Sequence, residues 1–340
     1  MNTLHSGACR RILLTLASLA GFALPALLVF APASASAQAS AQTFPNRTLR
    51  IVAPFTAGGG TDLVARTLAE GMSKELGQPV IVENKPGGGT VIGSDMVAKA
   101  PGDGYTLLLT TSAHAINTSL VKNLPYSTDK SFANVALVGR GPNMLVTRAD
   151  SPYKTIKDVL AAARANPGKL TYGSSGNGTA VHLAGELFKM MGKVDITHVP
   201  YRGAGPAYTD LLGGQIDFVF ATAAGVGKFV EAGKMRAIAV TSLARSPQWQ
   251  QVPTMAESGL PGYEADVWYA VFASGGTPPD VVAKLNAAVR KATEAPVFRT
   301  RVEGEGLVAA VGTPQELTAY VRAEEARWRK VVVEGKVTID

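Results

Sequence analysis

The stretch TLRIVAPFTAGGGTD, residues 48–62, decides the fold class, because an apolar strand runs through three glycines straight into a helix. After the glycines, apolar residues recur every four positions at Val64, Leu68, Met72 and Leu76, which places them on one helix face. Glycine permits a tight turn. The unpaired N–H groups and the partial positive charge of a first helical turn favour an anion. The stretch therefore indicates a seat for a carboxylate or phosphate, with an ordinary strand-to-helix turn as the alternative.

Strand-like and helical patterns alternate through the rest of the chain. Strand-like runs lie at residues 49–53, 80–83, 105–110, 135–139, 144–147, 170–173, 195–199, 216–221 and 237–241. Segments with the apolar spacing of helices lie between them. This order predicts the α/β class and, taken alone, a parallel, doubly wound sheet.

The strand, glycine turn and helix recur at residues 170–191, where KLTYG leads through SSGNGT into AVHLAGELFKMM. The second loop offers the short donors Ser174, Ser175, Asn177 and Thr179, together with the N–H groups of Gly178 and Thr179, and these same residue types also cap helices. Neither loop contains Lys or Arg, so dipoles, N–H groups and hydroxyls would hold a bound acid. If the two units face each other, both helix amino termini point into one cleft.

Known catalytic and nucleotide motifs do not match these loops. Counting from Gly58, the third glycine of a dinucleotide fingerprint would fall on Leu63, and no loop ends in the Gly-Lys-Ser/Thr of a P-loop. Asn177 stands where a nucleophile elbow needs its last glycine. His182 and Glu186 are one helical turn apart, but two metal ligands without a third favour helix packing over a metal site.

The amino-terminal residues 1–37 have the pattern of a cleavable signal peptide. Arg10 and Arg11 precede the apolar segment 12–30, and Ala35-Ser36-Ala37 is a small-residue cleavage site, with residues 39–41 as a second possibility. Cleavage would remove Cys9, the only cysteine, and exclude disulfides and thiolate chemistry. An uncleaved membrane anchor is the alternative for the same segment, although Pro25 and the small, polar flank argue against it.

The net charge of the chain is +7, and +5 without residues 1–37. The excess is spread out, because Lys and Arg alternate with Glu in the carboxy-terminal run. No basic cluster with interleaved aromatic residues accompanies it, so the charge pattern does not favour nucleic-acid binding.

From about residue 45 to the end, the chain resembles the tripartite tricarboxylate transporter substrate-binding receptors, the Bug family. The resemblance rests on blocks in the same order: PFTAGGGTDLVAR, VENKPGGGTVIG, INTSLVKNLPY, ANPGKLTYGSSGNGTAVHLAGELFK, HVPYRGAGPAYTDLLGGQIDFVF, GKMRAIAVTS and VPTMAESGLPGYE. It implies a two-lobed type II periplasmic binding protein, each lobe a mixed sheet flanked by helices, with a cleft between the lobes.

The resemblance also sets the expected domain boundaries and function. Lobe 1 would comprise residues 38–144 and 266–340, and lobe 2 residues 145–265, with hinge crossings near 141–146 and 263–268. The implied function is to bind a small organic mono- or dicarboxylate in the periplasm, as a monomer without cofactor or metal, and deliver it to a membrane transporter. Two alternatives stay open: a receptor for a membrane sensor kinase, and an enzyme acting on small acids.

The same resemblance nominates the ligand-binding residues. These are Phe55, Thr56, Gly59, Gly60, Thr61, Asp62 and Ser112 of the first lobe, and Ser174, Asn177, Gly178, Thr179 and Thr222 of the second. Asp62 has two interpretations: a first-turn carboxylate that stabilises the helix dipole, which we favour, or a ligand contact. The run TAAGVG, residues 222–227, is smaller than usual in the family, which leaves the identity of the ligand open.

Overall fold

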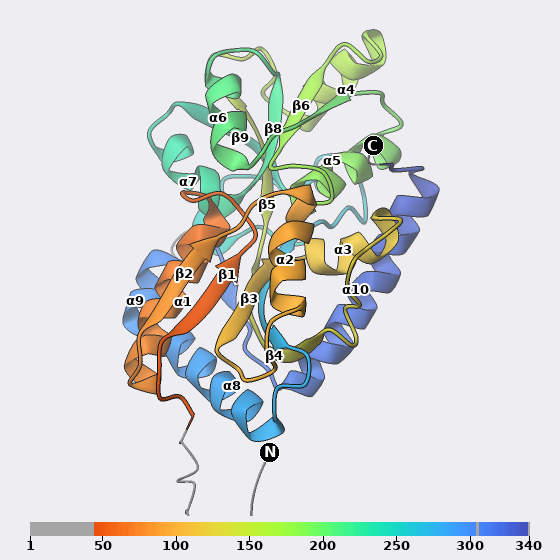
Figure 1. The fold of residues 1–340 in the computed structure, drawn as a ribbon. Coiled ribbons are helices and arrows are strands. Elements are labelled where there is room, and N and C mark those ends of the chain that lie inside the picture. Colours follow the sequence, from red (N-terminus) through yellow and green to blue (C-terminus); the bar gives the residue numbers. More distant parts are fainter. Residues whose placement is uncertain (1–43, 304–305, 339–340) are drawn as a thin grey trace, which may run out of the picture. The chain divides into compact units, whose positions relative to one another are not determined.

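The computed structural model describes residues 44–303 and 306–338 of the 340-residue chain. The predicted signal peptide and Cys9 lie outside the described residues. Within them, strands and helices alternate along the chain and assemble into two sheets, each flanked by helices (Figure 1). None of the helices in this part of the chain combines the length and apolarity needed to cross a bilayer.

The first sheet has six strands in the order β11-β4-β10-β3-β1-β2. Its strands are β1 (Leu49–Ala53), β2 (Val80–Asn84), β3 (Thr106–Thr111), β4 (Phe132–Gly141), β10 (Val267–Ser274) and β11 (Val308–Ala309). β1 pairs in parallel with β2 and β3, whereas β10 runs antiparallel to both β3 and β4.

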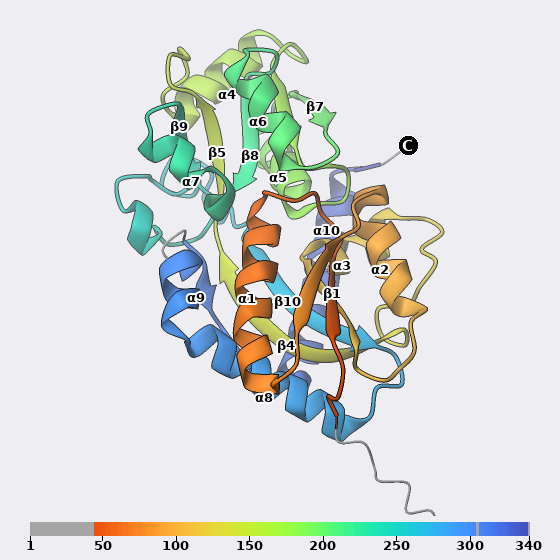
Figure 2. The same cartoon turned by 60° about the vertical axis from the view of Figure 1, so that its left-hand side comes forward.

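Helices cover both faces of the six-stranded sheet (Figure 2). One set is α1 (Gly60–Leu76), α8 (Pro279–Glu294) and α9 (Pro296–Arg301), and the other is α2 (Val91–Ala98), α3 (Ala113–Leu120) and α10 (Pro314–Glu334). Three of the four residues in the stripe predicted for α1 are fully buried: Val64, Leu68 and Met72 belong to one apolar cluster with Leu285 and Val289 of α8. Leu76, the last of the stripe, is half-buried and packs against the same cluster.

The second sheet has five strands in the order β7-β6-β8-β5-β9. They are β5 (Asn143–Arg148), β6 (Thr171–Ser174), β7 (Thr197–Pro200), β8 (Phe218–Thr222) and β9 (Met235–Val240). Helices α4 (Ile156–Ala165) and α5 (Ala180–Gly192) share one apolar cluster with this sheet, and α6 (Ala204–Leu212) and α7 (Ala223–Glu231) share another.

The pairing corrects the parallel arrangement expected from element order alone. Both sheets are mixed, as the resemblance implied, because β10 and β5 run antiparallel to their neighbours. The run VWYAVFAS that forms β10 was not among the predicted strands, although all of its residues are buried. β10 enters the six-stranded sheet on the chain's return from the other sheet, so no strand-helix-strand crossover fixes its direction.

The chain passes from β4 to β5 at residues 141–143 and returns along the segment before β10. Asn143 ties the two passages together, since its Nδ2 donates to the carbonyl oxygen of Ala265 at 2.7 Å and its backbone N–H donates to Thr241 Oγ1 at 2.8 Å. The Thr241 N–H donates back to the Asn143 carbonyl at 2.9 Å. The expected division into two moving lobes at these passages stays a prediction.

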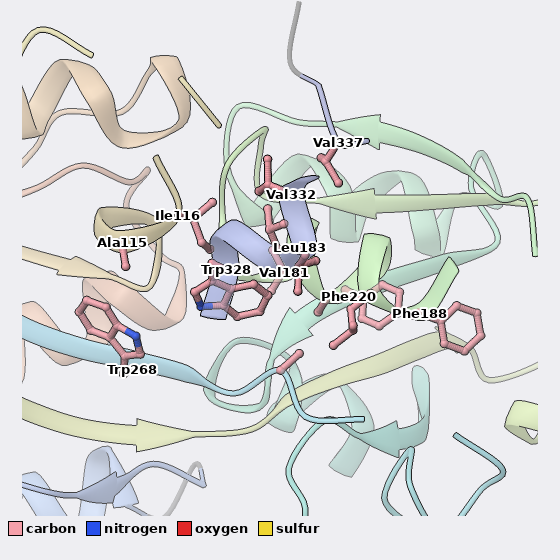
Figure 3. Packing of buried hydrophobic residues seen from close by; sticks show 14 of the residues in the cluster. Ala115, Ile116, Val181, Leu183, Phe188, Phe220, Trp268, Trp328, Val332 and Val337 are labelled. Carbon is pink, nitrogen blue, oxygen red and sulfur yellow. The ribbon is translucent and has the colours of Figure 1, made fainter. Parts of the chain in front are cut away.

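Helix α10 contributes to the core beyond its own sheet. Trp328 and Val332 of α10 lie in one apolar cluster with Val181 and Leu183 of α5 (Figure 3). The indole N–H groups of Trp328 and Trp268 both donate to Glu324 Oε2, at 3.0 and 2.9 Å. Both indole N–H groups, which are buried in the core and need an acceptor there, thus find one in the same carboxylate oxygen.

Candidate functional site

A pocket lies between the two sheets, at the carboxyl ends of β1, β6, β7 and β8. The empty space in this region, counted together with the solvent at its open mouth, is about 560 Å³. Its lining comprises Phe55, Thr56, Gly59, Gly60, Thr61, Thr111, Ser175, Thr179, Ala180, Val181, Gly203, Ala204, Ala207, Tyr208, Val219, Phe220, Ala221, Thr222 and Val267. Both sheets and their helices therefore contribute to one site.

Four helices begin at this pocket. Their N-cap residues Gly59, Thr179, Gly203 and Thr222, which precede α1, α5, α6 and α7, all line it. Helices α1, α6 and α7 have no side-chain hydrogen bond at the N-cap. Each amino terminus carries a partial positive charge of roughly half a unit, so their first-turn N–H groups can receive an anion.

Glycine lets three of these helix starts approach closely. A Cβ on Gly60 would lie 2.6 Å from Thr222 Oγ1 and 3.5 Å from the Tyr269 hydroxyl, so the start of α1 lies against the start of α7. A Cβ on Gly59 would lie 3.8 Å from the Cβ of Ala204, the first residue of α6. We call this place, where α1, α6 and α7 begin together, the three-helix seat.

The pocket wall carries no charged side chain. Its polar groups are the hydroxyls of Thr56, Thr61, Thr111, Ser175, Thr179, Tyr208 and Thr222, and the rest of the side chains are aliphatic or aromatic. The position that a Cβ on Gly225 would occupy lies 2.5 Å from the Tyr208 hydroxyl and 2.9 Å from Thr222 Oγ1. Hydroxyl groups therefore adjoin the three-helix seat and can donate to a bound oxygen atom.

The sequence profile described as "Tripartite tricarboxylate transporter family receptor" matches residues 64–336. The chain belongs to this family of receptors. Among curated relatives, the "UPF0065 protein in tcbD-tcbE intergenic region" of Pseudomonas sp. strain P51 is 42% identical over 86% of this receptor and 88% of its own length. "Protein BugT" of Bordetella pertussis is 36% identical over 90% of this receptor and 95% of its own length.

Solved structures of similar receptors share the fold. Rpa4515 of R. palustris with adipate matches with a TM-score of 0.84 and 36% identity, covering 87% of this receptor and 99% of that chain. MatC (Rpa3494) of Rhodopseudomonas palustris with bound malate matches with a TM-score of 0.81 and 35% identity, covering 85% and 100%. The fold is therefore that of periplasmic solute-binding receptors.

Seven of the twelve nominated residues of the receptor line the pocket: Phe55, Thr56, Gly59, Gly60, Thr61, Thr179 and Thr222. Asp62 does not. Its carboxylate accepts hydrogen bonds from Gly58 N, Arg66 Nε and Asn84 Nδ2, each at 3.0 Å. Burial acts to raise the pKa of Asp62, but these bonds outweigh it and hold the pKa below its usual value. Asp62 thus fixes the glycine turn in the described structure, and both interpretations of its role stay predictions.

Ser174 and Gly178 of the receptor support the second loop from behind the pocket. Ser174 Oγ lies 2.7 Å from His198 Nε2, and the Gly178 N–H donates to His182 Nδ1 at 3.1 Å. The two imidazole rings stack with centroids 4.2 Å apart. The contacts of both residues that the structure records are therefore internal to the fold.

Asn177 and Ser112 also lie outside the pocket lining. The Asn177 carbonyl faces Gly89 so closely that Gly89 has no space for a Cβ. Ser112 is fully buried, and its Oγ accepts the backbone N–H of Trp268 at 3.4 Å, next to the pocket residue Thr111. Ligand contact by these two residues stays a prediction without direct support from the geometry.

The predictions missed the start of α6 as part of the receptor's pocket. Gly203, Ala204, Ala207 and Tyr208 line it from this helix. The signal was present, because the strand β7 leads through the glycine turn YRG into a helix, which repeats the pattern found at the other two loops. The pair His182 and Glu186 forms no metal cluster, since no group of three or more possible ligands exists among the described residues.

Three histidines, the buried His114 and His182 and the half-buried His198, have pKa values far below the ordinary 6.5. Burial lowers the pKa of His114 to about 3 and that of His182 to about 4, the latter against the opposing effect of Glu186. Burial, with His182 beside it, lowers the pKa of His198 to about 3. The folded receptor therefore keeps all three rings neutral under mildly acidic conditions.

We expect the free energy of unfolding to fall as the pH is lowered from about 6.5 to about 4. In this window the histidines bind protons in the unfolded chain but not in the folded one. This difference lowers the free energy of unfolding by up to about 1.4 kcal/mol per pH unit for each histidine. Burial raises the pKa of Asp266 to about 7. The folded state therefore binds this proton more readily than the unfolded chain, and the resulting stabilisation at lower pH offsets the contribution of one histidine. Urea titrations at pH 7, 6 and 5 measure the slope. A His114→Phe variant should show a shallower slope, and stability that rises on acidification would contradict the assignment.

Proposed function

We propose that this receptor binds one small organic carboxylate in the pocket between its sheets and delivers it to a membrane transporter, without chemical change. The observation that carries the proposal is the meeting of uncapped helix amino termini at a pocket wall without charged side chains. Such a seat holds an anion through N–H groups and dipoles, which suits reversible capture. The similar receptors crystallised with adipate and malate support the same ligand class.

The proposal includes export and closure. Residues 1–37 act as a signal peptide that directs the receptor to the periplasm. The six-stranded and five-stranded parts move about the passages at residues 141–146 and 263–268. A ligand that contacts both parts binds the closed form more tightly, and this difference in affinity drives closure.

We expect thermal unfolding of the mature chain to shift upward with carboxylates of the right shape. A ligand present at a hundred times its dissociation constant adds about 2.7 kcal/mol to the free energy of unfolding. A panel of mono- and dicarboxylates, with sugars and amines for comparison, identifies the class. Chromatography of the incubated ligand should recover it unchanged. A response confined to sugars or amines, or conversion of a bound acid, would refute the proposal.

Two kinds of membrane protein are candidates for the partner of the liganded receptor, a transporter and a sensor kinase. Both require the same pocket. Co-purification of the liganded receptor with membrane proteins distinguishes them. Recovery of a transporter subunit supports the proposal, and recovery of a sensor kinase alone would replace it.

A further inference from the structure

The four helix starts at the pocket differ in how many of their donors are already used. At α5, the Gly178 N–H donates to His182 Nδ1, the Thr179 N–H and hydroxyl both donate to the Gly176 carbonyl, and Thr179 Oγ1 accepts the His182 N–H. The loop thus uses the N–H groups of Gly178, Thr179 and His182, whereas those of the pocket residues Ala180 and Val181 have no hydrogen bond among the described residues. The starts of α1, α6 and α7 have no side-chain cap, and they meet at the three-helix seat. At α7 the first N–H, that of Ala223, donates to the Pro142 carbonyl at 3.0 Å, so the following N–H groups are the ones left open.

Three of the four helix starts at the pocket therefore lie together in one place. The remaining wall of the pocket is formed by side chains such as Phe55, Val181, Val219, Phe220 and Val267. Burying a carboxylate without a cation or several donors costs far more than burying an apolar group. A second carboxylate on the ligand would meet no cationic side chain anywhere in the lining.

The ring of Phe55 provides an apolar surface at the pocket, outside the hydrophobic core. Phe55 is half-buried, lines the pocket, and belongs to none of the three apolar clusters found among the described residues. An aromatic ring placed this way can cover an aliphatic chain or stack on a ring of the ligand.

Resting on the proposed function, we infer that the ligand is an acid with a single carboxylate and an uncharged, apolar body. The carboxylate occupies the three-helix seat, and the body lies against Phe55 and the aliphatic wall. This receptor then differs in selectivity from the relatives crystallised with the dicarboxylates adipate and malate.

Isothermal titration of the mature chain with matched acids tests the inference. The pairs butyrate and succinate, hexanoate and adipate, and benzoate and terephthalate differ by the second carboxylate, and hexanamide and benzamide lack the charge altogether. We expect the monocarboxylate of the best pair to bind at least tenfold more tightly than its dicarboxylate, and the amides not to bind. Equal or tighter binding of the dicarboxylates overturns the inference and leaves the proposed function standing. Binding of amides, or of no acid, overturns both.

A pair of phenylalanine variants tests where the body lies. Phe55→Ala should weaken the binding of the best monocarboxylate at least tenfold. Phe44→Ala is the matched control, since Phe44 is also half-buried but packs edge-on against Tyr105, with ring centroids 5.0 Å apart, and does not line the pocket. The Phe44→Ala variant should bind the same acid with the affinity of the unsubstituted receptor. Undiminished binding by Phe55→Ala would overturn the assigned position of the apolar body.

Discussion

Replacing Gly60 with leucine is expected to weaken carboxylate binding at least a hundredfold, about 2.7 kcal/mol of binding free energy. The Cβ of the new side chain would lie 3.5 Å from Ala224 Cβ and only 2.6 Å from Thr222 Oγ1. The second distance is shorter than a van der Waals contact allows. The rest of the leucine would fill the three-helix seat and hold α1 away from α7. Isothermal titration with the best acid of the panel measures the loss.

The matched control for this variant is Gly205→Leu. Gly205 also lies in the first turn of a helix, α6, but it is exposed and a Cβ there meets nothing within 4 Å. Its leucine variant should retain parental affinity. Circular dichroism should show that both variants are folded. Parental affinity in a folded Gly60→Leu protein would mean that the ligand lies away from the start of α1.

The sequence predicted the local parts of the site because those parts obey short-range rules. A strand, a glycine turn and an amphipathic helix follow one another in β1 and α1, and the same order recurs in β6 and α5. The N-cap position of each helix then follows from the turn. The third occurrence, β7 and α6, obeys the same rule and was within reach of the same reasoning.

The pairing of strands depends on contacts that short-range patterns do not encode. β10 is separated by more than a hundred residues from β3 and β4, between which it lies. Its continuous apolar run is compatible with either strand direction or with a buried helix segment. The antiparallel direction follows from the route of the chain between the sheets, which is a tertiary property.

Side-chain partners were the least predictable feature of the site. The polar residues of the loop SSGNGT look alike as possible ligand donors, yet Ser174 lies behind the pocket on His198 while Thr179 lines it. The distinction depends on His198 of β7, a neighbouring strand whose register with β6 fixes the pair. Sequence spacing alone contains no such information.

Replacing Trp328 with alanine is expected to lower the free energy of unfolding by about 3–5 kcal/mol, the usual cost of deleting a large buried aromatic side chain. Trp328 is fully buried in the cluster that joins α10 to α5, and Glu324 would lose one of its two indole donors. The control is Val333→Ala on the same helix, where the side chain is 67% exposed and the change should stay within about 0.5 kcal/mol. Urea unfolding measures both. A loss below about 1 kcal/mol for Trp328→Ala would mean that Trp328 contributes little to the core, whereas the expected loss would show that the cluster joining α10 to α5 contributes to the stability of the fold.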